Sequence, residues 1–219
     1  VYVDQYSSVG FVHLQKTASA EETLLGKMAF EHYCAQHRVK VQHYHADNGI
    51  FHAHKWVLDC RAKGQGLTFA GVNAHHQNGR AEARIRRLQE MARTMLIHAK
   101  SKWPQEISAN LWPYAMRMAN EANNVTPNMN DEYRRSPMEL FANTRVASNP
   151  KHWQHFGCPV YVLDAKLQSG KPFHKWRQRS RLGIYLGRSP QHASSVGLVL
   201  NVHTGLTSPQ FHIKLDTAF

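Results

Sequence analysis

Residues 75–96, HHQNGRAEARIRRLQEMARTML, decide the fold. Apolar residues recur in this stretch at intervals of four and three, the spacing of one face of an α-helix. That face consists of Ala81, Ile85, Leu88, Ala92, Met95 and Ala99. Asn78 is a suitable N-cap, so Glu82 falls in or near the first turn, where the helix dipole favours an ionised carboxylate. Glu82 is therefore a single acid at the start of a helix that is rich in arginine.

Upstream of this helix, the sequence predicts short strands that alternate with helices. Residues 1–16 alternate apolar and polar side chains around a turn, as two hairpin-linked strands do. Helices are predicted at 20–36 and 52–61, and strands at 38–46 and 67–72. The strand at 38–46 ends at the turn Asp47-Asn48-Gly49. This order is typical of an α/β fold.

Downstream, the pattern changes from helices to short strands. A helix is predicted at 107–123, and Ser136-Pro137-Met138-Glu139 begins another with a capping box and a proline at its first position. After a candidate linker at 143–150, short strands are predicted at 160–163, 183–186, 196–202 and 207–213. We therefore expect two domains, an α/β core at 1–145 and a small antiparallel β-domain at 146–219.

The composition indicates a folded protein with a polyanionic partner. With 42% hydrophobic residues the chain can bury a core, and 27 Lys and Arg against 15 Asp and Glu give it a formal net charge of +12. Nucleic acid is the simplest partner for such a charge, and no apolar run suggests a membrane anchor. Residues 166–188 contain no acid and seven cations. These are Lys166, Lys171, Lys175, Arg177, Arg179, Arg181 and Arg188.

The cysteines, histidines and tryptophans do not indicate a further site. Three scattered cysteines predict a reducing compartment rather than a disulfide framework. Sixteen histidines without paired cysteines are a poor zinc signature. Four tryptophans are expected to pack in the core or between domains. These are Trp103, Trp112, Trp153 and Trp176.

Three carboxylates carry the functional hypothesis. Asp4 lies in the first predicted strand, Asp47 follows a later strand, and Glu82 is at a helix start. An α/β sheet gathers functional groups at strand ends and helix N-termini. Hard oxygen ligands suit Mg²⁺ or Mn²⁺, and two such ions can catalyse displacement at a phosphodiester. The basic residues around Glu82 then fit an anionic substrate.

The segments around these acids resemble the signatures of a known family. VDQYS at 3–7, ADNG at 46–49 and HHQNGRAEARIRRL at 75–88 are similar to those of copia-type LTR retrotransposon integrases. The segments SPMELFAN, HFGCPVYVL, RSRLGIYLGRSP and SPQFHIKLDTAF resemble the parts of the polyprotein that follow the integrase core. The chain departs from the family in an interval from Asp47 to Glu82 that is one residue short, and in His75, His76 and Ala83. The family's preceding zinc-binding module does not occur, so we expect a fragment of a longer protein.

The resemblance implies a fold, a metal site and a DNA partner. It implies an RNase H-like core, a mixed five-stranded sheet with flanking helices, followed by a small antiparallel SH3-like domain. Asp4, Asp47 and Glu82 would bind two Mg²⁺ or Mn²⁺ ions. The residues expected to bind DNA are His76, Gln77, Asn78, Arg80, Arg84, Arg86 and Arg87, together with Lys175, Arg177, Arg179 and Arg181 in the second domain.

The function implied is DNA integration. The enzyme would process the 3′ ends of the element DNA and join them to target DNA in the host nucleus, after a virus-like particle or cytoplasmic stage. It would act as a homo-oligomer, without a membrane or a small-molecule substrate. Three alternatives stay open: a related transposase using the same three acids, a decayed or domesticated DNA-binding module, and a basic structural protein without a site.

Overall fold

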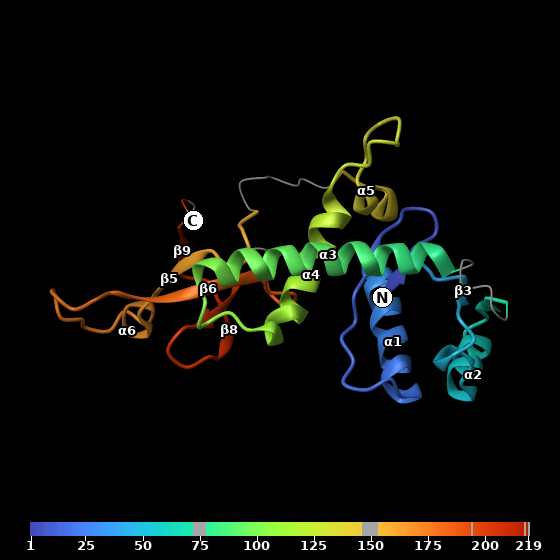
Figure 1. The fold of residues 1–219 in the computed structure, drawn as a ribbon, viewed down its shortest axis with the longest axis horizontal. Helices are drawn as coiled ribbons and strands as arrows, with labels where there is room; N and C mark the ends of the chain where they lie inside the picture. The colour runs from blue at the N-terminus through green and yellow to red at the C-terminus, as the bar shows by residue number, and fades with distance from the viewer. Residues whose placement is uncertain (72–77, 146–152, 194, 217, 219) are drawn as a thin grey trace. The chain divides into compact units, whose positions relative to one another are not determined.

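The computed structural model of the chain divides into two compact units (Figure 1). It describes residues 1–71, 78–145, 153–193, 195–216 and 218. Unit 1 comprises Val1–Leu88 and Asn120–Ala147, and unit 2 comprises Gln89–Ala119 and Ser148–Phe219. Two helices, α3 (Gly79–Lys102) and α4 (Trp112–Val125), contribute residues to both units. Unit 2 therefore takes its parts of α3 and α4 from the middle of the chain and its sheet from the end.

Unit 1 has the expected α/β character. Its strands are β1 (Tyr2–Val3), β2 (Gly10–Phe11), β3 (His43–Ala46) and β4 (Gly66–Phe69). Its helices, besides its parts of α3 and α4, are α1 (Ala20–Gln36), η1 (Ile50–His52), α2 (His54–Ala62) and α5 (Pro137–Ala142). Among the described residues the strands form two two-stranded sheets, antiparallel β1–β2 and parallel β3–β4. The resemblance implied one sheet of five strands. Strands of two to four residues offer few ladder hydrogen bonds to a further neighbour.

Helix α1 has the bounds that the sequence predicts. Ser19 caps it, because its hydroxyl oxygen accepts a hydrogen bond from the backbone N–H of Glu22 at 3.2 Å. Glu21 and Glu22 lie in the first turn, where the helix dipole favours them. Helix α5 begins with the predicted capping box between Ser136 and Glu139.

The core of unit 1 is aromatic. Tyr2 of β1 stacks on Phe30 of α1 with ring centroids 4.8 Å apart, and Tyr44 of β3 meets Trp56 of α2 edge to face at 5.4 Å. The buried core residues are Val9, Phe30, Cys34, Tyr44, Trp56, Cys60 and Phe141. Ring packing thus joins β1 to α1 and β3 to α2.

A fully buried lysine lies inside this core. The Lys27 ammonium donates hydrogen bonds to Glu31 Oε1 (2.6 Å), Asp59 Oδ2 (2.5 Å) and Gln65 Oε1 (2.7 Å). It also lies 5.1 Å from the centroid of the Tyr44 ring. A buried charge is tolerated only when its donors are satisfied, so these contacts fix α1, α2 and the turn before β4 together.

The Lys27 cluster predicts acid sensitivity. Burial alone raises the pKa of Glu31, but hydrogen bonds from Lys27, Lys63 and Gln65 outweigh it and lower that pKa to about 2. A depressed native-state pKa adds stability above the unfolded-state pKa of about 4.3, and this is lost as the pH falls toward 2. We expect the free energy of unfolding to decrease over this window in chemical denaturation series.

The matched variants for this prediction are Glu31→Gln and Glu132→Gln. Glu31→Gln lowers stability at neutral pH and flattens the acid dependence, because the titrating group is gone. Glu132 is exposed outside the cluster, so its variant keeps the wild-type profile. An unchanged acid profile in Glu31→Gln would contradict the assignment.

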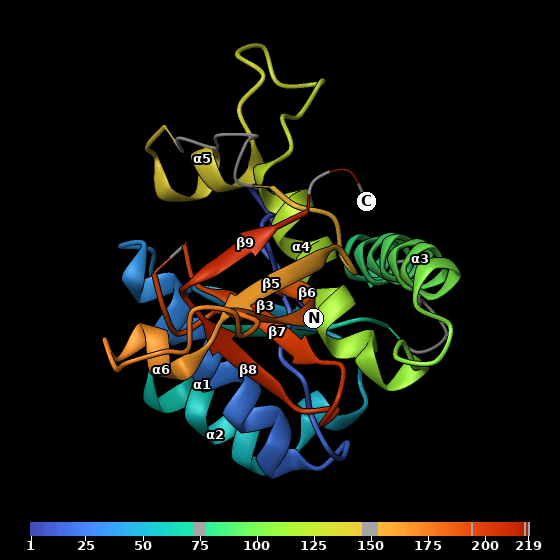
Figure 2. The same ribbon diagram turned by 90° about the vertical axis from the view of Figure 1, so that its left-hand side faces the viewer.

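Unit 2 contains a five-stranded antiparallel sheet (Figure 2). The strand order is β8 (Thr207–Gln210), β7 (Gly197–Asn201), β6 (Ser180–Arg188), β5 (Pro159–Leu163) and β9 (Ile213–Leu215). The small antiparallel sheet was predicted. The single strand predicted at 207–213 is divided, since β8 pairs with β7 at one edge and β9 pairs with β5 at the other.

The tryptophans are divided between packed and exposed positions. Trp103 donates from Nε1 to the backbone oxygen of Gly157 at 2.8 Å, and the Arg188 guanidinium lies 4.8 Å from the Trp153 ring centroid. Trp112 is 50% exposed and Trp176 is 83% exposed. These last two therefore do not lie in the core, and packing between the domains stays a prediction for them. Trp112 opens α4, and Trp176 lies in the loop between α6 (Ala165–Gln168) and β6. No helix in the described residues is long and apolar enough to cross a bilayer.

Candidate functional site

Asp4 was predicted in the first strand, but β1 ends at Val3 and Asp4 begins the hairpin loop between β1 and β2, called here the Asp4 loop (residues 4–9). Its Oδ2 accepts hydrogen bonds from the backbone N–H of Ser7 at 2.7 Å and from the Ser7 hydroxyl at 2.6 Å. The backbone N–H of Asp4 donates to the Val9 oxygen at 2.9 Å. One carboxylate oxygen therefore shapes the loop, and Oδ1 accepts no hydrogen bond from the described residues.

Asp47 follows β3 at the carboxyl end of the parallel pair. It is exposed, and its Oδ1 accepts a hydrogen bond from the Gly49 backbone N–H at 3.1 Å. Asn48 donates from Nδ2 to the Ala70 oxygen at 2.7 Å, which ties the turn after β3 to the end of β4. The sequence predicted this strand-end position, and the structure confirms it.

Glu82 is exposed in the first turn of α3, as predicted. Two arginines on either side of it in the sequence hold the helix to the Asp4 loop. Arg80 donates from Nη1 to the Gln5 oxygen at 2.5 Å, and Arg84 donates from Nη2 to the Ser8 oxygen. This pair of contacts, called here the arginine clasp, joins the helix that carries Glu82 to the loop that carries Asp4.

The clasp contacts a strained part of the loop. Ser8 has a left-handed backbone with φ 63°, a conformation that costs about 1–3 kcal/mol in a residue other than glycine. Burial, and then the neighbouring Arg87, lower the pKa of Arg84. Sequence reasoning predicted DNA contacts for Arg80 and Arg84. It did not predict that their guanidinium groups hydrogen-bond to the protein itself.

A second tie reaches the hairpin from α4. Asn120 and Asn124 each donate from Nδ2 to the Gly10 oxygen at 2.8 Å, and Asn124 Oδ1 accepts from the Gly10 N–H at 2.9 Å. A Cβ at Gly10 would lie only 2.5 Å from Asn120 Oδ1, so a larger residue there would have to displace the Asn120 amide. The sequence offered one signal for this tie, the spacing of four between Asn120 on the helix predicted at 107–123 and Asn124 directly after it.

The three carboxylates all belong to unit 1, but they are not assembled into a metal site. In the part of the chain that the structure describes, no three His, Cys, Asp or Glu side chains form a group able to hold a metal ion. Asp4, Asp47 and Glu82 suit a hard divalent cation by the chemistry of their oxygens, and not by a converged geometry. The two-ion site stays a prediction from the sequence.

The other predicted DNA-binding residues are mostly exposed. Arg86 and Arg87 on α3, and Lys175, Arg177 and Arg179 in unit 2, all have exposed side chains. Arg181 lies in β6 and is half-buried, with an Nη1 that finds no partner among the described residues. Asn78 is half-buried beside the start of α3. His76 and Gln77 lie outside the described residues.

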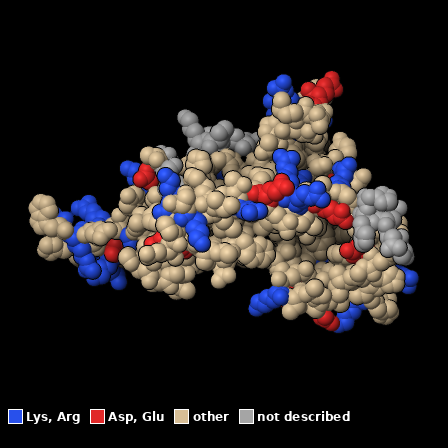
Figure 3. Space-filling view, in the orientation of Figure 1, with Lys and Arg blue, Asp and Glu red and all other residues tan. Residues whose placement is uncertain are grey.

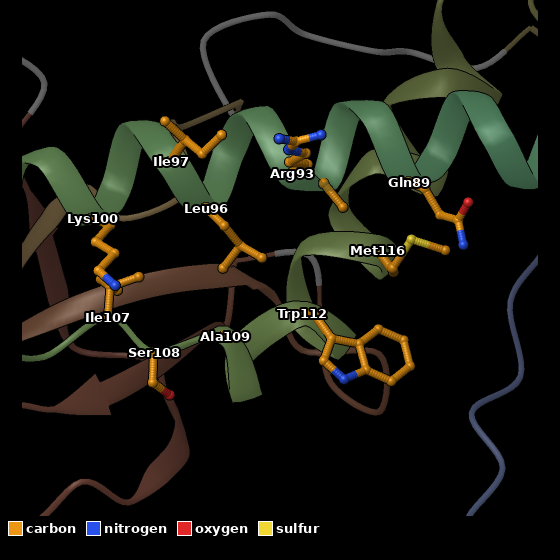
Figure 4. A pocket seen from close by; sticks show the side chains of 11 residues that line it. Gln89, Arg93, Leu96, Ile97, Lys100, Ile107, Ser108, Ala109, Trp112 and Met116 are labelled. Atoms are coloured by element: carbon orange, nitrogen blue, oxygen red, sulfur yellow. The ribbon is translucent and has the colours of Figure 1, made fainter.

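Unit 2 also contains an apolar groove of about 540 Å³ (Figure 4). The second half of α3 and the residues from Ile107 to Met116 line it. Its prominent side chains are Leu96, Ile97, Trp112 and Met116, with Arg93 and Lys100 beside them. None of its described lining residues is Asp, Glu, His or Cys, so it offers no metal ligand and no carboxylate or imidazole for acid–base chemistry. The groove was not predicted from the sequence.

No protein-family model and no curated protein matches the chain. Several solved structures are similar to it. The HTLV-2 integrase catalytic core domain in complex with magnesium, in trimeric form, has a TM-score of 0.47 and 16% identity over 64% of this chain and 80% of that one. The BIV integrase catalytic core domain has a TM-score of 0.47 and 18% identity over 64% of this chain and 82% of that one.

A longer match includes most of this chain. A chain in the simian T-cell lymphotropic virus intasome, in complex with the PP2A regulatory subunit B56 gamma, has a TM-score of 0.49 and 16% identity. It spans 97% of this chain and 70% of that one. At identities this low and TM-scores below 0.5, these likenesses carry no inference about the activity of this chain.

The arginine clasp predicts a specific loss of stability. Replacing Arg84 with Met removes a charge-assisted hydrogen bond and leaves the Ser8 carbonyl without this donor. We expect the free energy of unfolding to fall by about 1.5–3 kcal/mol. Hydrogen exchange of the Asp4 loop amides should accelerate. Arg86→Met, on an exposed site of the same helix, should stay within about 0.5 kcal/mol of wild type. Equal stabilities of the two variants in urea denaturation would rule out the clasp.

Proposed function

We propose that this chain is the integrase of a copia-type LTR retrotransposon, a metal-dependent polynucleotidyl transferase. The proposal rests on one observation: three acids from three ordered sequence signatures stand at a hairpin loop, a strand end and a helix start of one α/β unit. The arginine clasp connects two of these positions. The enzyme processes the 3′ ends of the element DNA and joins them to target DNA.

Asp4, Asp47 and Glu82 hold two Mg²⁺ or Mn²⁺ ions in this proposal. When bound, the ions activate the attacking oxygen and stabilise the leaving oxygen of a phosphodiester. The clasp keeps the Asp4 loop on the Glu82 helix, and the exposed Arg86 and Arg87 neutralise phosphates of the DNA. The two kinds of residue therefore have separate roles. The carboxylates provide the metal ligands, and the arginines position the loop and neutralise phosphate charge.

The cysteines support a mechanism without a covalent enzyme intermediate. All three are free and buried. Burial, with the nearby Asp4 and Glu31, raises the pKa of Cys34 to about 12, and burial with Asp216 raises that of Cys158 to about 11. Such thiols are not nucleophiles at neutral pH. A direct attack of water, and then of a DNA 3′-hydroxyl, needs no protein nucleophile.

The partners in this proposal are DNA and other copies of the chain. Element ends and target DNA are both polyanions, which the net charge of +12 attracts in a salt-dependent manner. The resemblance to integrases implies that the functional form is a homo-oligomer. The reaction takes place in the host nucleus.

A second candidate is a DNA-binding module without catalysis. The observation in its favour is the acid-free basic run at 166–188, which lies in unit 2 and does not depend on the three acids of unit 1. A related transposase is a third possibility with nearly the same chemistry. The DNA sequence around the gene distinguishes a transposase from an integrase, because an LTR element encodes a reverse transcriptase downstream.

Asp47→Asn and Glu82→Gln should abolish joining and spare DNA binding. The substrate is a labelled duplex with the terminal sequence of the encoding element, with plasmid as target and Mg²⁺ or Mn²⁺ present. Loss of an outer-shell partner of a metal already costs about 10–100-fold, so loss of a ligand should exceed about 100-fold. Strand transfer is followed by gel, and binding by anisotropy.

Glu90→Gln is the matched control, because Glu90 is an exposed glutamate on the same helix, two turns beyond Glu82. It should join DNA as wild type does. Joining at the wild-type rate in Glu82→Gln would refute the assignment. A wild-type chain that binds the duplex but yields no joined product with either metal is the DNA-binding module.

A further inference from the structure

The loop between α6 and β6, residues 169–179, is a dense cationic surface called here the basic loop. Lys and Arg side chains gather over it at the left of Figure 3, the end at which it is drawn in Figure 1. Its cations are Lys171, Lys175, Arg177 and Arg179, and all four are exposed. None of them forms an ion pair with a carboxylate of the described residues.

The basic loop has a defined backbone. At its base, the Asp164 N–H donates to the Arg179 oxygen at 2.8 Å, and the Lys171 N–H donates to the Lys166 oxygen at 2.9 Å. Near its tip, the Arg177 N–H donates to the His174 oxygen at 3.1 Å, which closes a turn around Trp176. This turn therefore places Trp176 between Lys175 and Arg177 in the loop.

Trp176 is the most exposed large hydrophobic residue in the described part of the chain, with 83% of its surface accessible. Tryptophan is usually highly buried, because it has a large apolar surface. The Lys175 ammonium lies 5.4 Å from its ring centroid, a cation–π contact that leaves much of the ring open. An accessible flat ring among unpaired cations has the chemistry of a stacking platform for nucleic-acid bases.

We propose that the basic loop binds single-stranded nucleic acid, with Trp176 stacked on an unpaired base and the cations on the flanking phosphates. The ring takes any base, because every base has a π-face, so the contact is tolerant of sequence. Within a duplex the bases are already stacked on one another and do not offer this face. The inference rests on the proposed function only in taking nucleic acid as the partner, and it uses none of the three carboxylates.

Stacking and charge have separable signatures in salt titrations. Each cation that neutralises a phosphate of a single strand adds about 0.7 to the slope of log K against log salt. A neutral ring releases no counterion. Loss of Trp176 should therefore weaken binding equally at every salt concentration, whereas loss of a cation should reduce the slope.

The test measures, by fluorescence anisotropy, the affinity of the chain for a labelled thymidine oligonucleotide and for a matched duplex. EDTA is present so that no metal-dependent catalysis takes place. We expect Trp176→Ala to weaken single-strand binding about tenfold with an unchanged salt slope. Trp176→Phe should keep most of the affinity. Arg177→Gln should reduce the slope by about 0.7. Trp112→Ala, at the half-exposed tryptophan of α4, is the matched control and should bind as wild type.

Two results would overturn the inference: wild-type single-strand affinity in Trp176→Ala, or equal losses on single strand and duplex. Trp176 is on the surface, so its variants should fold, and circular dichroism verifies this. The outcome is independent of the proposed enzyme. If the chain joins DNA but Trp176→Ala does not weaken single-strand binding, only the stacking proposal is refuted. If Trp176→Ala weakens binding but the chain joins no DNA, only the proposed transferase activity is refuted.

Discussion

A buried lysine, Lys27, determines how the helices and strands of unit 1 are held together. The Lys27 ammonium is fully buried, so every donor must find an oxygen, and the three oxygens come from α1, α2 and the residue before β4. Glu31 in turn accepts a hydrogen bond from the Tyr44 hydroxyl of β3 at 3.1 Å. Any displacement of these elements would leave a buried charge without a partner, which costs more than the loss of ordinary packing. Asp47 follows β3 directly, so its position depends on this cluster.

Lys and Arg side chains have two different roles in this chain, and the amino-acid composition does not distinguish them. Lys27 and Arg84 hold the fold, although both count toward the net charge of +12. Arg177 and Arg179 lie in the open without ion pairs among the described residues. The second kind is open to solvent. The basic character of the segment around Glu82 is thus partly structural.

Periodicity and local chemistry predicted much of the fold. The bounds of α1, the capping box of α5 and the buried stripe through Leu88 follow from interactions within one helix, so the sequence displays them directly. The division of the last predicted strand does not, because it depends on which edge of the sheet each half joins. The burial of Lys27 depends on oxygens of Asp59 and Gln65, which lie 32 and 38 positions further along the sequence. Such long-range pairings have no local sequence signal.

The candidate site shows the same division between local and long-range information. Sequence placed Asp47 at a strand end and Glu82 at a helix start, because turns and caps are local. It could not show which contacts bring the Asp4 loop toward α3, since the arginine clasp joins residues more than 70 positions apart. Carboxylates repel one another when no cation is near, so in the proposed function a bound divalent ion would offset the cost of bringing the three together. The clasp joins the supports of Asp4 and Glu82 by direct hydrogen bonds, whereas Asp47 takes its position from the β3–β4 pair and from the Asn48 bond to the Ala70 oxygen.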